Sequence, residues 1–281
     1  MSGPTSARPD PDERAIAAGA RFERWFRWLA PLGLALVAIG AWSLAVRVNH
    51  IPPYILPGPE LVLNSLVQDW GTLWPSLLVT LRITGMALAA AIVVGGGLAV
   101  LFSLSRWIEL SLFPFAVILQ VTPIVAVAPL ILIYVDNTYL ALLICAWIVA
   151  FFPILSNTTL GLNSADHHLR DLFQLYGASR WQQLWLLRLP AAMPYFLGGL
   201  RIAGGLSLIG AIVAEFAAGT AGTGSGLAYR ILEAGYRLNI PRMFAALLLI
   251  SLTGIVIFLA FTLLQHLLLR RWHESAIARD R

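Results

Sequence analysis

Three ionisable side chains stand inside long apolar stretches of the sequence: Arg82, Arg201 and Glu215. A charge in the middle of a bilayer costs at least about 2.5–3.5 kcal/mol, so such residues commonly form an ion pair or mark a solute path. We expect Glu215 to pair with Arg82 or with a loop arginine, and we expect Arg201 to extend toward the membrane interface. The functional alternative is that these three residues line a gate or a pathway.

A further polar feature, Thr122-Pro123, interrupts another apolar stretch. Proline has no N–H group and therefore breaks the hydrogen-bond ladder of a helix. The carbonyl groups that this frees are tolerated in a membrane where they face protein or a water-filled path. We predict a kink here, and a pathway-lining role for the pair is the alternative.

Several kinds of chemistry are excluded by what the sequence lacks. All 19 basic residues are arginine, so neither a P-loop nor a Schiff-base lysine can occur. Cys145 is the single cysteine, which excludes an intrachain disulfide. The adjacent His167 and His168 do not share one helical face, and we interpret them as a loop pair. We therefore predict a protein that is not an enzyme and has no catalytic residue, no cofactor and no metal.

The elements that must position these residues are membrane helices. The chain has 281 residues, of which 59% are hydrophobic and 12% charged, whereas a soluble domain is about one-quarter charged. An apolar stretch of about eighteen residues or more is long enough to cross a bilayer as a helix. Six such stretches predict an all-α membrane protein with six transmembrane helices: 28–46, 77–104, 110–134, 139–162, 195–217 and 244–269.

The arginines are distributed unevenly between the two ends of these helices. With six spans, both termini lie on one side, which receives thirteen arginines against four on the other. Basic residues concentrate in cytoplasmic loops, so both termini are predicted to be cytoplasmic. The predicted parts are an N-terminal arm (1–27), a membrane domain (28–269) that includes a cytoplasmic loop (163–194), and a C-terminal tail (270–281). The basic charge is assigned to membrane flanks, with no nucleic-acid partner.

The cytoplasmic loop is amphipathic and divides at Gly177-Ala178-Ser179. We predict two short helices joined at this turn, the second of which ends at Leu189-Pro190 because proline cannot continue a helix interior. Another surface could approach the backbone of Gly177 closely, since glycine has no side chain. The alternative is an ordinary loop that lies at the lipid headgroups.

The spacing of this loop resembles a known signature. In binding-protein-dependent ABC importer permeases, E-A-A is followed by three residues, G, nine residues and I-x-L-P. Here Gly177, Leu189 and Pro190 match, Leu187 replaces isoleucine, and Asp171 keeps the acid although both alanines are lost. Four further segments are similar to the nitrate, sulfonate and taurine permeases: 52–59, 199–203, 213–216 and 219–226. The region from 151–154 through Glu215 resembles more closely a pyrimidine- and riboflavin-type branch. The resemblance covers roughly residues 50–270.

The resemblance implies a type I importer permease in the bacterial inner membrane. It implies a permease homodimer, a dimer of ABC ATPase subunits that hydrolyse ATP, and an extracytoplasmic solute-binding protein. Transport would proceed by alternating access, coupled to the ATPase through the segment 171–190. The residues expected to carry this coupling are Asp171, Tyr176, Gly177, Ala178, Ser179, Leu187, Leu189 and Pro190.

The class of transporter and the identity of the solute each leave alternatives. The alternative function is a secondary transporter driven by an ion gradient, although such proteins often show internal repeats and several intramembrane acids. The resemblance implies a small organic anion or heterocycle as the solute: nitrate, a sulfonate, taurine, or a pyrimidine- or riboflavin-type vitamin precursor.

Overall fold

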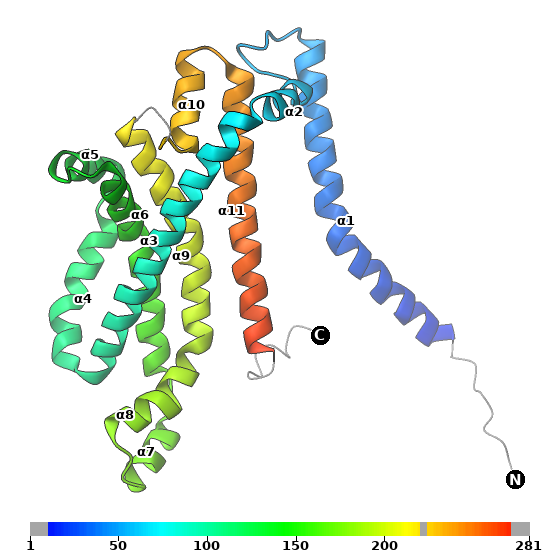
Figure 1. Cartoon of the computed structure of the whole chain (residues 1–281). Helices are drawn as coiled ribbons and strands as arrows, with labels where there is room; N and C mark the ends of the chain where they lie inside the picture. The colour runs from blue at the N-terminus through cyan, green and yellow to red at the C-terminus, as the bar shows by residue number, and fades with distance from the viewer. Residues whose placement is uncertain (1–10, 220–223, 271–281) are drawn as a thin grey trace, which may run out of the picture. The chain divides into compact units, whose positions relative to one another are not determined.

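The structure of the chain is a computed structural model that describes residues 11–219 and 224–270, with side chains from residue 29 onward. The regular elements of these residues are all helical (Figure 1). They are α1 (Pro11–Val48), α2 (Pro59–Gln68), α3 (Trp70–Leu104), α4 (Arg106–Val121), α5 (Ile124–Tyr134), α6 (Thr138–Asn163), α7 (His167–Leu175), α8 (Arg180–Gln183), the π-helical turn η1 (Leu184–Arg188), α9 (Leu189–Ala218), α10 (Leu227–Tyr236) and α11 (Ile240–Leu269). The absence of strands agrees with the predicted fold class.

The chain divides into two compact units between Leu63 and Asn64, inside α2. The first unit contains α1, and its segment Leu29–Val48 is long and apolar enough to cross a membrane. Arg47, in the last turn of α1, forms an ion pair with Glu60 at the start of α2. The predicted arm lies partly outside the described residues, and residues 11–27 form the first part of α1 itself.

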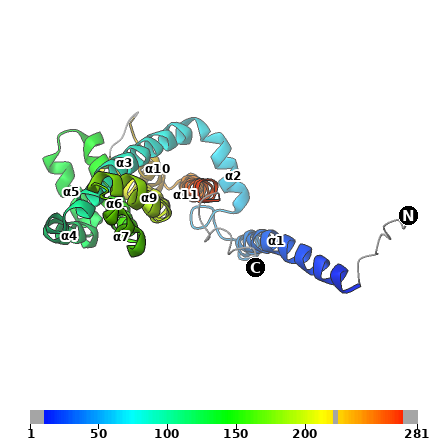
Figure 2. The same cartoon turned by 90° about the horizontal axis from the view of Figure 1, so that it is seen from below.

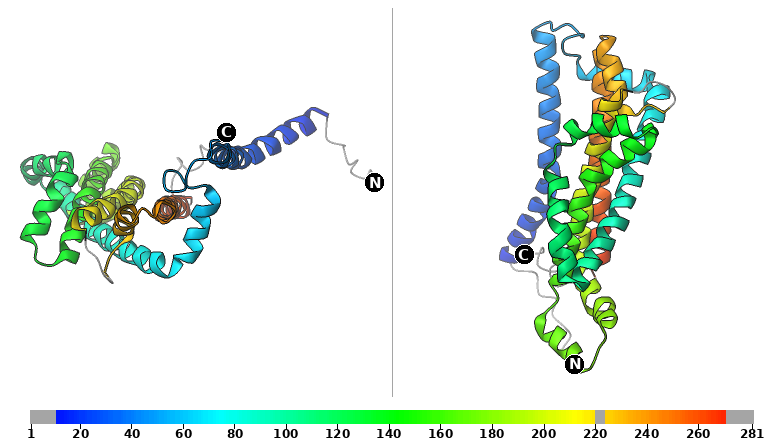
Figure 3. Two further views of the ribbon diagram at one scale, coloured as in Figure 1. Left: turned by 90° about the horizontal axis from the view of Figure 1, so that it is seen from above. Right: turned by 90° about the vertical axis from the view of Figure 1, so that its left-hand side faces the viewer.

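Four helices of the second unit can each cross a membrane: Trp70–Leu104, Thr138–Asn163, Arg180–Ala218 and Ile240–Leu269. The predicted third span is different, because it consists of α4 and α5 with a bend of 101° between them. The described residues therefore contain five unbroken candidate spans, or six when the bent pair is counted as one. Figure 3 shows α5 turned across one end of the bundle.

The bend lies at Thr122-Pro123, where the sequence predicts a kink. Both residues are extended, with ψ angles of 122° and 111°. A residue before proline is disfavoured in the helical region, and the proline nitrogen has no hydrogen to donate. The Thr122 hydroxyl instead donates to the carbonyl oxygen of Ile118, 2.7 Å away, at the end of α4. The kink is confirmed, and it is large enough to divide the span into two helices.

The centre of the second unit is the packing of α9 on α6, with α3 against both. Small residues permit this close approach. A methyl group added at Gly210 of α9 would lie 2.8 Å from the Cα of Ala146 in α6. On the other side of α9, the ring of Phe261 in α11 covers Gly204. Figure 2 shows α9 between α6 and α11. Glycines of α9 thus permit helix–helix contacts within the chain on two of its sides.

The second unit carries different features at its two ends. The short helices α7 and α8 lie at one end, which we call the loop end, and α10 lies at the other, which we call the α10 end (Figure 1). The helix that begins with α8 and continues through η1 and α9 runs from one end to the other.

Candidate functional site

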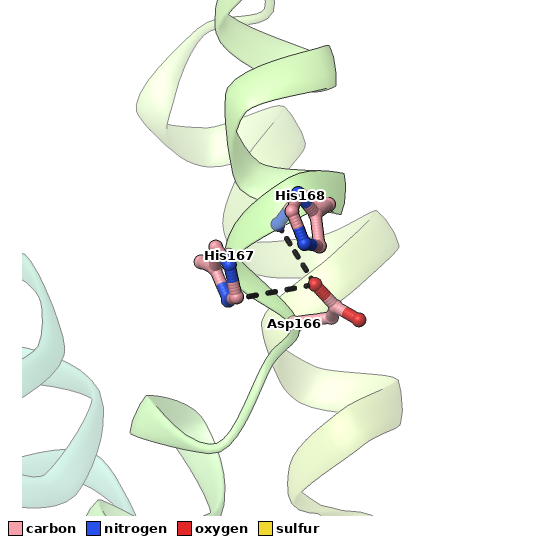
Figure 4. Close-up of side chains that lie close together, drawn as sticks. All are labelled: Asp166, His167 and His168. Atoms are coloured by element: carbon pink, nitrogen blue, oxygen red, sulfur yellow. Dashed lines mark hydrogen bonds and ion pairs between the residues drawn. The ribbon is translucent and has the colours of Figure 1, made fainter.

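At the loop end, α7 begins at a side-chain cap. Asp166 accepts a hydrogen bond of 2.7 Å from the backbone N–H of His168, which satisfies one free donor of the first turn. His167 lies beside the same carboxylate, with 3.8 Å between its Nδ1 and Oδ1 of Asp166 (Figure 4). The potential ligand atoms of these exposed residues lie within 4.8 Å of one another. Capping of α7 accounts for the position of the Asp166 carboxylate without an ion.

The end of α7 explains why a glycine stands at position 177. Gly177 has a φ angle of +69°, a region that residues with a Cβ atom rarely adopt. Its N–H donates to the carbonyl oxygen of Gln174, and the N–H of Ala178 donates to that of Phe173, both at 2.9 Å. This pair of bonds is the Schellman arrangement that terminates a helix. The predicted turn at 177–179 is present, and its geometry requires the glycine.

The second half of the loop corrects the sequence interpretation. Ser179 caps α8 by accepting from the N–H of Gln182, and the Gln182 side chain accepts from the Ser179 N–H at 2.7 Å. The helix then continues past Leu189-Pro190, so the prediction that Pro190 ends it was wrong. In the π turn η1, the Leu189 N–H donates to the carbonyl oxygen of Leu184. This wider turn places Pro190 in the first turn of α9, where a missing N–H is tolerated.

The predicted coupling residues fall into two groups. Asp171, Tyr176, Gly177 and Ser179 are exposed, and Ala178 is partly buried beside them. Leu187 is buried at 8% exposure, and Leu189 and Pro190 are partly buried where the helix joins the body of the unit. The same part of the loop carries exposed apolar side chains that we call the loop surface: Leu172, Leu175, Tyr176 and Trp181. Leu175 and Tyr176 are 85% and 83% exposed, and they lie outside the candidate membrane spans, between Asn163 and Arg180.

At the α10 end, Glu215 is the centre of a buried polar cluster. Its side chain is 2% exposed, and its Oε1 accepts a hydrogen bond of 2.8 Å from the hydroxyl of Thr80 in α3. Its Oε2 accepts a bond of 3.0 Å from the backbone N–H of Ala228 in the first turn of α10. Thr80 also accepts from the Leu227 N–H at 2.9 Å. The carboxyl group thus joins α3, α9 and α10, and it lies where a helix N-terminus favours an acid.

Gly226, the residue before α10, is required by this arrangement. A methyl group at this position would lie 2.0 Å from Oε1 of Glu215. Heavy atoms cannot approach so closely, so any larger residue would displace either the carboxyl group or α10. The structure therefore gives a steric reason for one glycine of the Gly-rich stretch that the resemblance singled out.

Paired charges surround this cluster. Arg230 of α10 donates to Ser76 of α3 at 2.9 Å and to Glu233 at 2.8 Å. Asp69 forms an ion pair with Arg242 at the start of α11. The guanidinium of Arg242, which donates to the Asp69 carboxylate, lowers the pKa of Asp69, although burial opposes this shift. Arg230 lowers the pKa of Glu233 in the same way. Asp69 and Glu233 therefore each have an arginine partner within the second unit.

The predicted pathway residues do not form one constellation. Arg82 is exposed and forms no ion pair among the described residues, so the expected pairing of Glu215 with an arginine was wrong. The Arg201 guanidinium lies over the ring of Phe258 in α11, 5.5 Å from its centroid. Thr122 and Pro123 lie at the bend between α4 and α5. Of this set, Glu215 alone belongs to the buried cluster.

Sequence reasoning missed three of the partners of Glu215. Thr80 lies 135 residues away in the sequence. The second is a backbone N–H group in the first turn of α10, and the third is Gly226, which lies against the carboxyl group. A threonine facing a glycine-rich turn is a weak signal in one sequence. Backbone donors give no side-chain signal at all.

Comparison with known proteins identifies the family. A family described as "Binding-protein-dependent transport system inner membrane component" matches residues 87–274, which is more than half of the chain. The riboflavin transport system permease protein RibX of Chloroflexus aurantiacus is 34% identical over 255 residues, covering 89% of this chain and 93% of that protein. The formylaminopyrimidine transport permease protein ThiX of Halalkalibacterium halodurans is 31% identical over 248 residues, covering 88% and 97%.

A solved structure shares the fold. The crystal structure of an amino acid ABC transporter with histidines matches with a TM-score of 0.58 and 19% identity, covering 74% of this chain and 97% of that chain. With helices long enough to cross a membrane, the matched family and relatives of nearly equal length, the chain belongs to the binding-protein-dependent inner membrane components, the permeases of ABC importers.

Proposed function

We propose that this permease passes a small solute from a binding protein to the cytoplasm by alternating access, driven by a separate ATPase that docks on the loop surface. The observation that carries this proposal is the exposure of Leu175 and Tyr176 on a short helix with defined caps at both ends. Apolar side chains that are held in water by a rigid element favour a protein partner, because burying them in an interface removes the cost of their exposure.

The orientation follows from the arginines. The loop end carries Arg170, Arg180 and Arg188, and a basic end favours the cytoplasmic side of a membrane. Both termini would then be cytoplasmic, and the α10 end would face the solute-binding protein. ATP is available on the cytoplasmic side, which is where a motor subunit must bind.

The connection between the two ends supports the coupling role. The loop surface is followed directly by the helix of residues Arg180–Ala218, which ends three residues after Glu215. Movement of α8 by the ATPase would therefore reach the Glu215 cluster through one continuous helix. The buried bonds of Glu215 to α3 and α10 would form a closed state of the gate, and their rearrangement would accompany opening.

The solute class is inferred from the relatives. Their names refer to riboflavin and formylaminopyrimidine, and those of more distant relatives to taurine, aliphatic sulfonates and nitrate. We propose a small heterocycle or small organic anion, delivered by the binding protein to a homodimer of permeases.

The test uses the full importer, purified with its ATPase and reconstituted in proteoliposomes. Leu175→Ser and Tyr176→Ser should reduce both the recovery of the ATPase and the uptake that depends on ATP, with no change in permease yield. Tyr236→Ser is the matched control, because Tyr236 is also an exposed aromatic residue (87%) but lies at the α10 end. It should retain the ATPase. Uptake that survives removal of ATP and collapses with the proton gradient would instead indicate a secondary transporter.

A further inference from the structure

Two polar cavities adjoin at the loop end, of about 320 and 430 Å³, and share Ser103 and Arg188 in their walls. The larger cavity is also lined by Arg106 at the start of α4 and by Arg170 of α7. The smaller one is lined by Arg180 of α8. Basic residues from four separate elements thus converge on one region, which neither the family resemblance nor the coupling role uses.

None of these arginines forms an ion pair with an acidic residue in the part of the chain that the structure describes. Arg188 donates to the main-chain carbonyl of Ser103 and Arg170 to that of Asn163, each at 2.7 Å. Both acceptors are neutral. The Nε atoms of Arg170 and Arg188 are buried and lack hydrogen-bond partners among the described residues. Within that part of the chain, no carboxylate lies within 4.0 Å of either guanidinium, although Glu109 lines the larger cavity.

A bound anion would compensate the positive charge of this group of arginines. Arg170 and Arg188 are partly buried, whereas Arg106 is exposed at the edge of the larger cavity. Partly buried guanidinium groups repel one another and have lost hydration, so the pair of Arg170 and Arg188 is unfavourable without a compensating charge. A guanidinium presents its N–H groups as a planar fork that matches the oxygens of a phosphate. Three forks around one cavity suit a tetrahedral oxyanion better than a single carboxylate, which has two oxygens to share among them.

The wall of the larger cavity has features suited to the phosphate of a lipid headgroup. Beside Arg106, the first two turns of α4 expose Trp107 at 81% and Leu110 at 57%. Leu110 and Phe102 also line the larger cavity. Exposed tryptophan and apolar residues next to basic ones are typical of helix ends at the headgroup level of a bilayer. Basic pockets between helices at the cytoplasmic side are suited to anionic headgroups.

We propose that Arg106, Arg170 and Arg188 form a binding site for a phosphate group, supplied by an anionic phospholipid of the surrounding bilayer or by free phosphate. The bound group bridges α4, α7 and η1, and so fixes the loop surface relative to the body of the second unit. This site would make the position of the loop depend on the bound phosphate group, whether or not an ATPase is attached.

The experiment uses the full-length permease, purified in detergent without its ATPase. Binding of phosphatidylglycerol and of phosphatidylcholine is measured by native mass spectrometry, and stabilisation by inorganic phosphate is measured by thermal unfolding. Arg170→Gln and Arg188→Gln should each weaken phosphatidylglycerol binding by about tenfold, as expected for loss of a charge-assisted pair. Arg170→Lys keeps the charge and loses the fork, and should show a smaller loss with an unchanged elution volume.

The control is Arg237→Gln, which removes an exposed arginine at the α10 end and should leave lipid binding unchanged. Selective, arginine-dependent retention of phosphatidylglycerol would support a lipid source. Stabilisation by inorganic phosphate that the same variants abolish would support the site with a free anion as its source. The proposal is overturned if all variants retain both lipids equally and phosphate has no effect, or if Arg237→Gln weakens binding as much as Arg188→Gln.

Discussion

The two ends of the second unit differ in how many of their polar groups have partners within the chain and in how much apolar surface they expose. At the α10 end, Glu215 is buried with hydrogen-bond partners from α3 and α10, and Asp69 and Glu233 have arginine partners. At the loop end, the loop surface is exposed and Arg170 and Arg188 bind only neutral carbonyls. An end that is complete in one chain can hold a conformation, whereas an incomplete end requires partners. Substitutions should therefore act on stability at the first end and on association at the second.

The largest expected effect is that of Glu215→Ala. Removal of the carboxyl group leaves the Ala228 N–H buried without an acceptor and leaves the Thr80 hydroxyl with only its 3.2 Å bond to the carbonyl oxygen of Ser76. A buried donor without an acceptor costs about 1–3 kcal/mol. We expect a loss of about 3 kcal/mol in the free energy of unfolding, measured by thermal unfolding in detergent. Glu215→Gln keeps one acceptor oxygen and should lose about 1 kcal/mol. Equal stability of all three proteins would show that this end is not internally satisfied.

Gly226→Ala tests the same cluster from the opposite side. The added methyl group would overlap Oε1 of Glu215, and overpacking of this kind costs about 1–3 kcal/mol. Gly205→Ala is the matched control, since the space around Gly205 in α9 is open within 4 Å. The control should unfold at the wild-type temperature or slightly above it. A Gly226→Ala protein that unfolds with its control would contradict the close contact with Glu215.

At the loop end, Gly177→Ala should destabilise only α7. Alanine in the left-handed region costs about 1–2 kcal/mol, and the space around Gly177 is open, so no steric clash adds to this. We expect faster amide hydrogen exchange in α7 with little change in global unfolding. Gly198→Ala, at an open site within α9, should leave exchange in α7 unchanged. Global destabilisation by Gly177→Ala would mean that the loop end also supports the body of the unit.

The smallest effect concerns pH. Arg242 holds the pKa of Asp69 below its ordinary value of 3.8, so the ion pair stabilises the folded state fully above that pH. Its contribution is lost as the pH falls through the lowered pKa. The unfolding temperature of Asp69→Asn should therefore lie below that of the wild type at pH 7, and the difference should shrink below pH 3.8. Asp136→Asn, which changes an exposed loop carboxylate, is the control, and a pH-independent difference would contradict the pairing.

Local patterns predicted the features that depend on local rules. Hydropathy located the membrane helices, and Pro123 was expected to break its span because the missing N–H acts on its own helix. Pro190 obeys the same rule but gave the wrong prediction, since the π turn before it changes the register of the backbone bonds. A π turn depends on how the helix packs, and no residue pattern in one sequence specifies it.

The prediction of an arginine partner for Glu215 was wrong for a different reason. Sequence reasoning compared side chains and therefore sought an arginine for an acid. In the structure, Glu215 instead accepts from the Thr80 hydroxyl of α3 and from the Ala228 N–H in the first turn of α10. These donors become available only when three helices that are distant in the sequence pack together. The loop landmarks were easier to predict, because Gly177 and its cap lie within a few residues of each other.

The helix from Arg180 to Ala218 has 39 residues, and no loop interrupts it. Each residue of a helix turns the chain by about 100° and advances it by about 1.5 Å. Insertion or deletion of a single residue within it would therefore rotate α8 by about a quarter of a turn relative to Glu215, without removing any side chain from either end. The number of residues between the two ends thus sets the rotation of α8 relative to Glu215. This number must be kept as strictly as the identity of the residues themselves.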